Sequence, residues 1–170
     1  RRIGKDSSMW LSIDSCAKKE SDVVLSAGNT GALMALSKLI LKTVDGIERP
    51  AITALWPNPK GNSVVLDLGA NIDISANQLV QFGIMGYAYA LCVLKNENPK
   101  VAILNIGHEE MKGSNNLQEA YDKLSNIFSS NFIGFVEGDD LSKGTSDVII
   151  TDGFTGNVAL KTAEGIAKLI

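Results

Sequence analysis

The sequence has few of the residues that build metal sites and disulfide frameworks. Among its 170 residues it contains two cysteines, Cys16 and Cys92, and a single histidine, His108. The cysteines lie far apart, and neither has a second Cys or His at the spacing of a zinc site. We therefore expect two free thiols packed as small apolar side chains and no bound metal. His108 is expected to be an incidental loop residue, because no G-x-S-x-G nucleophile motif accompanies it.

Long hydrophobic runs and an excess of positive charge are also missing. The longest apolar run, residues 82–94, has 13 residues and falls short of the roughly 18 that a membrane span needs, so it predicts a buried helix. A net charge of −3 and a pI near 5.2 argue against a nucleic-acid partner. The basic cluster Arg1, Arg2 and Lys5 could meet an acidic partner or remain solvated. No secretory leader pattern opens the chain, which predicts a cytoplasmic location.

What the sequence does contain is an alternation of short β-branched runs with stretches of helical length. The expected strands cover residues 23–28, 51–57, 63–69, 101–107, 132–138 and 147–153, and the expected helices cover residues 31–42, 75–94, 115–128 and 157–170. This pattern predicts one α/β domain over residues 1–170, built on a mainly parallel sheet with helices on both faces. Because the chain opens at Arg1 and ends inside a helical pattern, we expect a central fragment of a longer protein.

Four of the expected strands end in loops of small residues, which read SAGNTG, DLGAN, NIGHEEMKGSN and TDGFTGN. Strand-to-helix loops of a parallel sheet emerge at its carboxyl edge, so these loops are expected to converge on one crevice. Two of them share the pattern G-x-T-G, at residues 28–31 and 153–156. Their glycines permit close backbone approach and the following helix offers unpaired N–H groups, which suits phosphate. Neither matches a Walker A loop or a dinucleotide fingerprint, which disfavours an NTPase or an NAD enzyme.

The candidate site residues come from these loops. The expected binding residues are Gly28, Asn29, Thr30, Gly31, Asn71, Gly153, Thr155, Gly156 and Asn157. Lys112 is a candidate catalytic cation that could neutralise phosphate, or it could be a surface lysine paired with Glu109 or Glu110. Asp152 is a candidate catalytic carboxylate that could orient a nucleophile or pair with Lys112, or it could cap the next turn.

Two further carboxylates, Asp67 and Asp73, flank the Gly-Ala-Asn loop. A divalent ion needs more oxygen ligands than two carboxylates of uncertain geometry provide. The sequence therefore predicts no metal at this position.

Taken together, the stretches SAGNTGALM, LDLGAN, LNIGHEEMKGS and DVIITDGFTGNVALKT resemble the phosphate acyltransferase family of fatty acid and phospholipid synthesis, the PlsX family. RR followed by SSM, GIERPAI at 46–52 and LVQFGIMGYAYA at 79–90 add to a resemblance that covers nearly the whole chain. The family loop pattern Gly-x-Glu-x-x-Lys-Gly is filled by Gly107, Glu109, Lys112 and Gly113. The family's opening Asp-x-Met-Gly-Gly-Asp strand and its C-terminal portion are not present in the chain.

The resemblance implies transfer of a long-chain acyl group from acyl carrier protein to orthophosphate, without a cofactor. It also implies a fold like that of isocitrate and isopropylmalate dehydrogenases and of phosphotransacetylase, a homodimer, and peripheral association with the inner face of the membrane through parts outside this chain. Under this hypothesis Lys112 balances the phosphate charge and Asp152 orients or deprotonates the phosphate. Three alternatives stay open: a phosphotransacetylase-like enzyme that uses acyl-CoA, a dehydrogenase of the related fold, and a noncatalytic scaffold.

Overall fold

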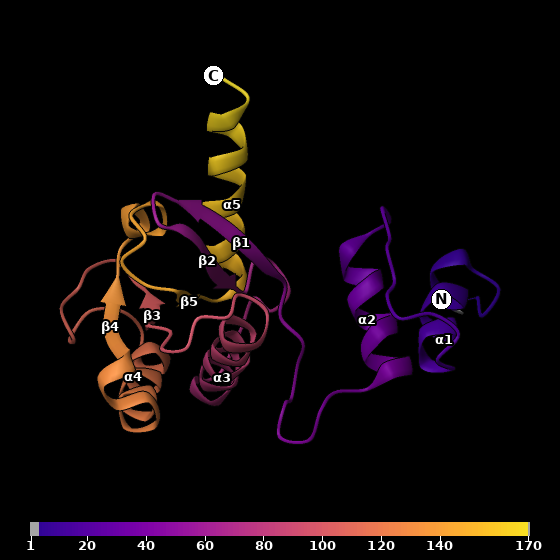
Figure 1. The fold of residues 1–170 in the computed structure, drawn as a ribbon, viewed down its shortest axis with the longest axis horizontal. Helices are drawn as coiled ribbons and strands as arrows, with labels where there is room; N and C mark the ends of the chain where they lie inside the picture. The colour runs from indigo at the N-terminus through magenta and orange to yellow at the C-terminus, as the bar shows by residue number, and fades with distance from the viewer. Residues whose placement is uncertain (1–3, 170) are drawn as a thin grey trace. The chain divides into compact units, whose positions relative to one another are not determined.

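The computed structural model describes residues 4–169, which form two compact units with a boundary in the chain between Pro50 and Ala51 (Figure 1). The single domain expected from the sequence stays a prediction. Of the expected basic cluster, Arg1 and Arg2 lie outside the described residues.

The first unit is a pair of helices, α1 (Ser8–Ala17) and α2 (Thr30–Leu41), which contact each other. Each begins at a side-chain cap: Ser7 accepts a hydrogen bond from the Trp10 amide and Asn29 accepts one from the Ala32 amide. The strand expected at 23–28 is wrong, because residues 4–50 contain no strand and Leu25 is 96% exposed. An isolated extended segment has no neighbour to pair its backbone, and the β-branched residues alone do not supply one.

The second unit contains a five-stranded sheet in the order β1-β2-β5-β3-β4. Its strands are β1 (Thr53–Asn58), β2 (Gly61–Leu66), β3 (Val101–Leu104), β4 (Phe132–Val136) and β5 (Val148–Ile150). β1 and β2 form an antiparallel hairpin at one edge, and the pairings β2–β5, β5–β3 and β3–β4 are parallel. The mainly parallel sheet expected from the sequence is thereby confirmed, with an antiparallel edge strand added.

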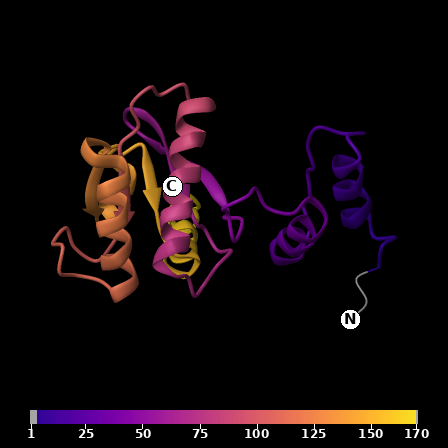
Figure 2. The same cartoon turned by 90° about the horizontal axis from the view of Figure 1, so that it is seen from below.

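Three helices and two short 3-10 helices complete this unit. They are α3 (Ala76–Cys92), α4 (Asn115–Phe128), α5 (Gly153–Ala167), η1 (Ser129–Asn131) and η2 (Gly138–Ser142). α3 and α4 lie side by side in both ribbon views (Figures 1 and 2). Within residues 4–169, no helix is both long and apolar enough to cross a membrane.

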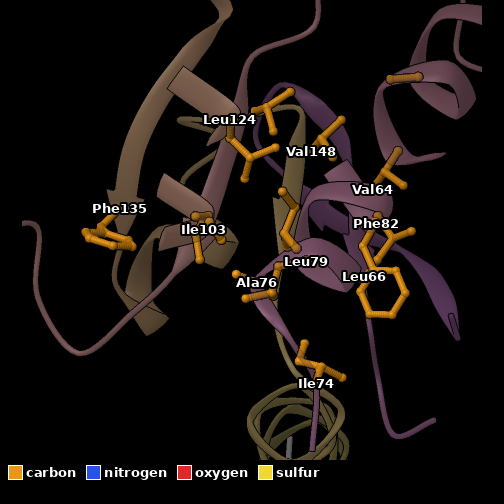
Figure 3. Packing of buried hydrophobic residues seen from close by; sticks show 14 residues of the cluster. Val64, Leu66, Ile74, Ala76, Leu79, Phe82, Ile103, Leu124, Phe135 and Val148 are labelled. Carbon is orange, nitrogen blue, oxygen red and sulfur yellow. The ribbon is translucent and has the colours of Figure 1, made fainter. Parts of the chain in front are cut away.

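Alternating strand residues divide the core into two layers. Val64 and Leu66 of β2 pack with Val148 of β5 and with α3 and α4, as Figure 3 shows, whereas Val65 points to the other layer with α5. This period of two is what a buried sheet with both faces covered requires. The helices on both faces expected from the sequence are therefore confirmed.

Helix starts and the cysteines differ from expectation. α2 and α5 begin at Thr30 and Gly153, before the expected positions 31 and 157, so the T-G pair of each G-x-T-G falls in a first helical turn. The side chains that cap these helices, Asn29 and Asp152, precede both pairs, so the helices begin earlier in the sequence than expected. Both cysteines are free; Cys16 is partly buried, but Cys92, the last residue of α3, is exposed rather than packed.

Candidate functional site

A buried carboxylate organises the loop after β2. Asp67 is fully buried, and its Oδ1 accepts hydrogen bonds from the amides of Ile52 (2.9 Å) and Ala70 (3.0 Å). Its Oδ2 accepts from the amide and the side-chain Nδ2 of Asn71, at 2.7 and 2.8 Å. Four donors occupy the acceptor positions of one carboxylate, so Asp67 holds the Gly-Ala-Asn loop in shape rather than facing a ligand.

That loop packs backbone to backbone against the turn that opens α5. The Gly153 amide donates to the Asn71 carbonyl at 2.8 Å. A Cβ on Gly153 would lie 2.7 Å from backbone atoms of Asn71, and one on Gly156 would overlap the Asp67 carbonyl oxygen. Asn157 completes the contact, because its Nδ2 would be 2.7 Å from a Cβ on Gly69. The structure thus brings Asn71, Gly153, Gly156 and Asn157 together at the carboxyl edge of the sheet.

Asp152 is the N-cap of α5. Its Oδ1 accepts from the Thr155 amide at 2.8 Å, and its Oδ2 accepts from the Thr155 hydroxyl at 2.7 Å. This is the capping role that the sequence left open beside a catalytic one. Both oxygens of the carboxylate and the Thr155 hydroxyl proton are engaged in the turn.

A cavity of about 460 Å³ opens at this edge. Its walls are formed by Ile72, Asp73, Ile74, Ser75, Leu79, Ser114, Asn116, Leu117 and Asp152. Three of these residues, Ser75, Ser114 and Asp152, are the N-caps of α3, α4 and α5. Every long helix of the second unit therefore begins at the rim of one cavity.

Three helix N-termini surround the cavity, whose wall also carries the carboxylates of Asp73 and Asp152. Each terminus carries the equivalent of about half a positive charge and first-turn N–H groups without intrahelical partners. Ser75 and Gln78 form a capping box, and Ser114 accepts from the Leu117 amide at 3.4 Å. Asn116 ties two of the helices together by donating to the Ile74 carbonyl at 2.9 Å. The arrangement suits an anion that several N–H groups can approach at once.

The two carboxylates on the cavity wall differ in whether they have hydrogen-bond partners. Asp152 is bound into its own turn, as described above. Asp73 is exposed, and no group within residues 4–169 forms a hydrogen bond or ion pair with its side chain. Asp73 is thus the carboxylate of the cavity wall that remains available to a ligand.

Lys112 lies in the loop after β3 and is held by neighbours in that loop. Its Nζ is 2.9 Å from Glu109 Oε2, and its carbonyl accepts from the buried Asn105 at 3.0 Å. The hydrogen bond from Lys112 lowers the pKa of Glu109. This is the surface pairing that the sequence left open, and Lys112 is not among the residues that form the cavity wall.

His108 joins the same loop to the segment after β4. Its Nδ1 lies 3.1 Å from the Phe135 carbonyl, and its Nε2 lies 3.5 Å from the buried Asp140 and 3.9 Å from Glu137. The hydrogen bond to the Phe135 carbonyl, and then the two carboxylates, raise the pKa of His108 although partial burial opposes them. The histidine expected to be incidental therefore makes tertiary contacts.

The other G-x-T-G turn belongs to the first unit. The Gly28 amide donates to Ser26 Oγ at 3.2 Å, and Asn29 caps α2. A small cavity of about 280 Å³ beside Gly28 is lined by Ser8, Met9, Ser12, Leu25, Ser26 and Ala27. Convergence of all four loops on one crevice stays a prediction, because only three of them lie in the second unit.

Sequence reasoning missed most of the cavity wall. Ser75, Ser114 and Asn116 were not expected as site residues, and Asp73 was considered only as a metal ligand. The S-x-x-Q pattern of residues 75–78 is a capping-box signal that could have placed the start of α3. Within residues 4–169 no group of three or more His, Cys, Asp or Glu side chains is placed to hold a metal ion.

The mainly parallel sheet with helices on both faces is an α/β fold of the phosphotransacetylase type. A phosphotransacetylase from Streptococcus pyogenes superposes with a TM-score of 0.71 at 17% identity, covering 93% of this chain and 54% of that one. A branched-chain phosphotransacylase from Enterococcus faecalis gives a TM-score of 0.63 at 13% identity, covering 94% and 65%. The phosphotransacetylase-like fold expected from the sequence is confirmed.

Sequence comparison then places the chain in a family. The family model described as "Fatty acid synthesis protein" matches residues 1–170, and the chain belongs to this family. A "Phosphate acyltransferase" of Rhodospirillum rubrum is 57% identical over 99% of the chain, and one of Parvibaculum lavamentivorans is 53% identical over 100% of it. The chain spans about half the length of these relatives, 48% and 47%.

Proposed function

We propose that the full-length protein transfers a long-chain acyl group from acyl carrier protein to orthophosphate and so forms acyl phosphate for phospholipid synthesis. The observation that carries this proposal is the cavity at which α3, α4 and α5 all begin. Three helix N-termini around one space favour a small anion with several oxygens. Relatives named phosphate acyltransferase support the reaction class.

In the proposed reaction the cavity positions orthophosphate for attack on a thioester. A phosphate oxygen bonds to the carbonyl carbon, the carbon–sulfur bond breaks, and the phosphate proton passes to the departing thiolate. The products are acyl phosphate and the free thiol of the carrier. Because phosphate is itself the nucleophile, the protein's main tasks are positioning and stabilisation of the oxyanion. Because phosphate attacks the thioester directly, the mechanism needs no acyl-enzyme, and neither Cys16 nor Cys92 takes part.

The two charged residues have separate proposed roles, and that of Asp152 differs from the orienting or deprotonating role expected from the sequence because Thr155 engages both of its oxygens. Lys112 balances the phosphate charge after exchanging its contact with Glu109 for the anion. Asp152 acts through the turn it caps, by fixing Thr155 and the first turn of α5. The first-unit turn, Gly28 to Gly31, supplies further N–H and hydroxyl donors to the substrate.

We also propose the setting in which the full-length protein works. It is a cytoplasmic homodimer that associates peripherally with the inner face of the membrane, and it uses no cofactor. Its donor is acyl carrier protein rather than coenzyme A. The donor has to be tested, because the sequence leaves open a phosphotransacetylase-like enzyme that uses acyl-CoA and one fold can host different activities.

The test follows both products of the full-length protein. Acyl-acyl carrier protein is mixed with phosphate, released thiol is measured, and acyl phosphate is trapped with hydroxylamine. Thiol release and trapped acyl phosphate in equal amounts are expected, and both should require phosphate. Thiol release without acyl phosphate would indicate a thioesterase. A folded protein that forms neither product would favour a noncatalytic scaffold.

Two comparisons sharpen the assay. Equal or better turnover with acyl-CoA would replace the carrier-protein donor with the phosphotransacetylase-like alternative. Lys112→Met should raise the KM for phosphate, whereas Lys60→Met, an exposed lysine in the turn of the β1–β2 hairpin, should not. Loss of activity in a folded variant with both cysteines replaced by serine would contradict direct displacement.

A further inference from the structure

One feature of the cavity is unusual for an anion site: a carboxylate without a partner. Asp73 lies on the cavity wall two residues before Ser75, the N-cap of α3. Its side chain is exposed and forms no hydrogen bond or ion pair within residues 4–169. Asp152, on the same wall, has each carboxylate oxygen occupied by a donor from Thr155. Both carboxylates carry a negative charge, and Asp73 is the one whose oxygens have no donor from residues 4–169.

A free carboxylate beside three positive helix ends has a specific chemical consequence. An ionised carboxylate only accepts hydrogen bonds, so it can face an anion favourably only if that anion carries a proton. Orthophosphate at neutral pH always retains at least one P–OH group, whereas sulfate has none. The two ions otherwise match in charge range, shape and size, and helix N-termini alone would bind both.

We infer that Asp73 is the specificity-determining residue of this cavity, where its carboxylate accepts the hydrogen bond of the phosphate hydroxyl and thereby excludes fully deprotonated oxyanions such as sulfate. This inference rests on the proposed function, because it concerns the same phosphate site. In this inference the two carboxylates have different roles. Asp152 stabilises the turn that begins α5, and Asp73 accepts the hydrogen bond of the phosphate hydroxyl. A site built around a hydrogen bond rejects an analogue that lacks the hydrogen.

The test compares binding of inorganic phosphate, arsenate and sulfate by titration calorimetry on the full-length protein at constant ionic strength. Arsenate retains a hydroxyl group as phosphate does, so it controls for shape and charge. The wild-type protein should bind phosphate and arsenate similarly and sulfate much more weakly. In Asp73→Asn the amide can donate to sulfate and still accept from phosphate, so the preference for phosphate over sulfate should fall about tenfold, the lower end for a hydrogen bond to a charged group.

Matched variants separate recognition from general charge effects. Asp73→Glu should restore most of the selectivity, because it returns an acceptor-only group. Asp122→Asn removes the same charge from an exposed position of α4 outside the cavity wall and should leave the ratio unchanged. Because Asp73 makes no hydrogen bond or ion pair within residues 4–169, its variants should fold, and Asp73→Asn should lose only a little stability from the missing charge near the N-terminus of α3.

The outcomes distinguish the inference from the proposed function. Unchanged phosphate-to-sulfate selectivity in Asp73→Asn overturns the inference while an active wild-type enzyme keeps the function. Equal loss of selectivity in Asp122→Asn also overturns it, since a long-range charge effect would then suffice. If the wild-type protein binds no phosphate and forms no acyl phosphate, the function and the inference fail together.

Discussion

The two G-x-T-G turns have nearly the same sequence but join their helices at different points. In the first unit Asn29, inside the motif, is the N-cap, so Thr30 is the first residue of α2. In the second unit Asp152, before the motif, is the N-cap, so Gly153 is the first residue of α5 and Thr155 the third. The same four-residue pattern therefore presents its threonine in two different positions of the first turn.

The surroundings of the glycines differ even more. Gly153 and Gly156 are buried where α5 passes directly over the loop after β2, and their missing side chains permit that approach. A Cβ on Gly31 would meet only Asn29 Oδ1 at 3.4 Å, an ordinary contact. One on Gly28 would lie 2.7 Å from the flexible end of Met9 and 3.3 Å from Ser26 Oγ, so side chains and not backbone would have to move. Backbone contacts thus account for the glycines of the second turn, whereas the glycines of the first turn meet only side-chain atoms.

This difference shows how an internal repeat should be interpreted. Shared residues indicate that both turns start a helix, but they do not establish that both bind one ligand. In the second unit the proposed anion site combines the N-terminus of α5 with the N-termini of α3 and α4. In the first unit, any requirement for glycine has to come from what binds there.

The largest difference in the free energy of unfolding is expected when one glycine of each turn is replaced by alanine. Gly156→Ala would place a methyl group against the Asp67 carbonyl, so it should lower the free energy of unfolding by about 3 kcal/mol. Gly31→Ala should raise it by about 0.5 kcal/mol, because alanine favours a helix over glycine. Urea denaturation of both variants measures this. Similar losses in the two would contradict the different packing of the turns.

Replacing the two N-cap residues should also destabilise the second unit more than the first, by a smaller difference in the free energy of unfolding. Asp152→Ala removes acceptors for the Thr155 amide and hydroxyl and should cost about 2 kcal/mol, whereas Asn29→Ala removes one acceptor and should cost about 1 kcal/mol. Asp152→Asn retains a good cap and is the control for shape. Thermal or urea unfolding measures which variant loses more stability. A destabilised Asp152→Asn with an unaffected Asp152→Ala would exclude capping as the cause.

The threonines should separate stability from binding. Thr155→Val removes a hydroxyl that donates to Asp152 and should cost about 0.5–1 kcal/mol of stability. The Thr30 hydroxyl has no hydrogen-bond partner within residues 4–169, so Thr30→Val should leave unfolding unchanged and raise the KM for phosphate if the first turn binds substrate. An unchanged KM in Thr30→Val would remove that hydroxyl from the proposed site.

The sequence predicted the second unit better than the first, for a physical reason. The alternating residues of β2, β3 and β5 are buried on both faces, and continuous apolar runs of this kind are strong signals. The segment at 23–28 has a similar composition but no strand beside it, and composition does not reveal the absence of a partner. The signals at Gly153 and Asn71 were recognisable because small residues followed a strand.

The cavity itself could not be predicted at the level of single residues. Its wall depends on where α3, α4 and α5 start relative to one another, which the sheet order determines. The charge of Lys112 and Asp152 and their position near glycines indicate candidate site residues, but their immediate partners, Glu109 and Thr155, depend on local geometry. Asp73 could be recognised as available only once Asp152 was seen to be engaged.

The smallest effect concerns Lys112, the cation proposed to balance the phosphate charge. Lys112 lowers the pKa of Glu109, so the pair persists above the ordinary carboxyl pKa and is lost as the pH falls through the lowered value. At neutral pH Glu109 therefore competes with phosphate for Lys112. Glu109→Gln should lower the KM for phosphate about twofold, in line with the strength of exposed ion pairs. Steady-state kinetics at pH 7 measures this change.

A matched ion pair on α4 controls for loss of a negative charge. Glu119 pairs with Lys123 at 2.6 Å and lies outside the cavity wall, so Glu119→Gln should leave the KM for phosphate unchanged. The effect of Glu109→Gln should also disappear when Lys112 is replaced by methionine, because the two changes act through one contact. A lowered KM that persists without Lys112 would show that the carboxylate repels phosphate directly. The second turn would then depend on helix N-termini alone for its positive charge.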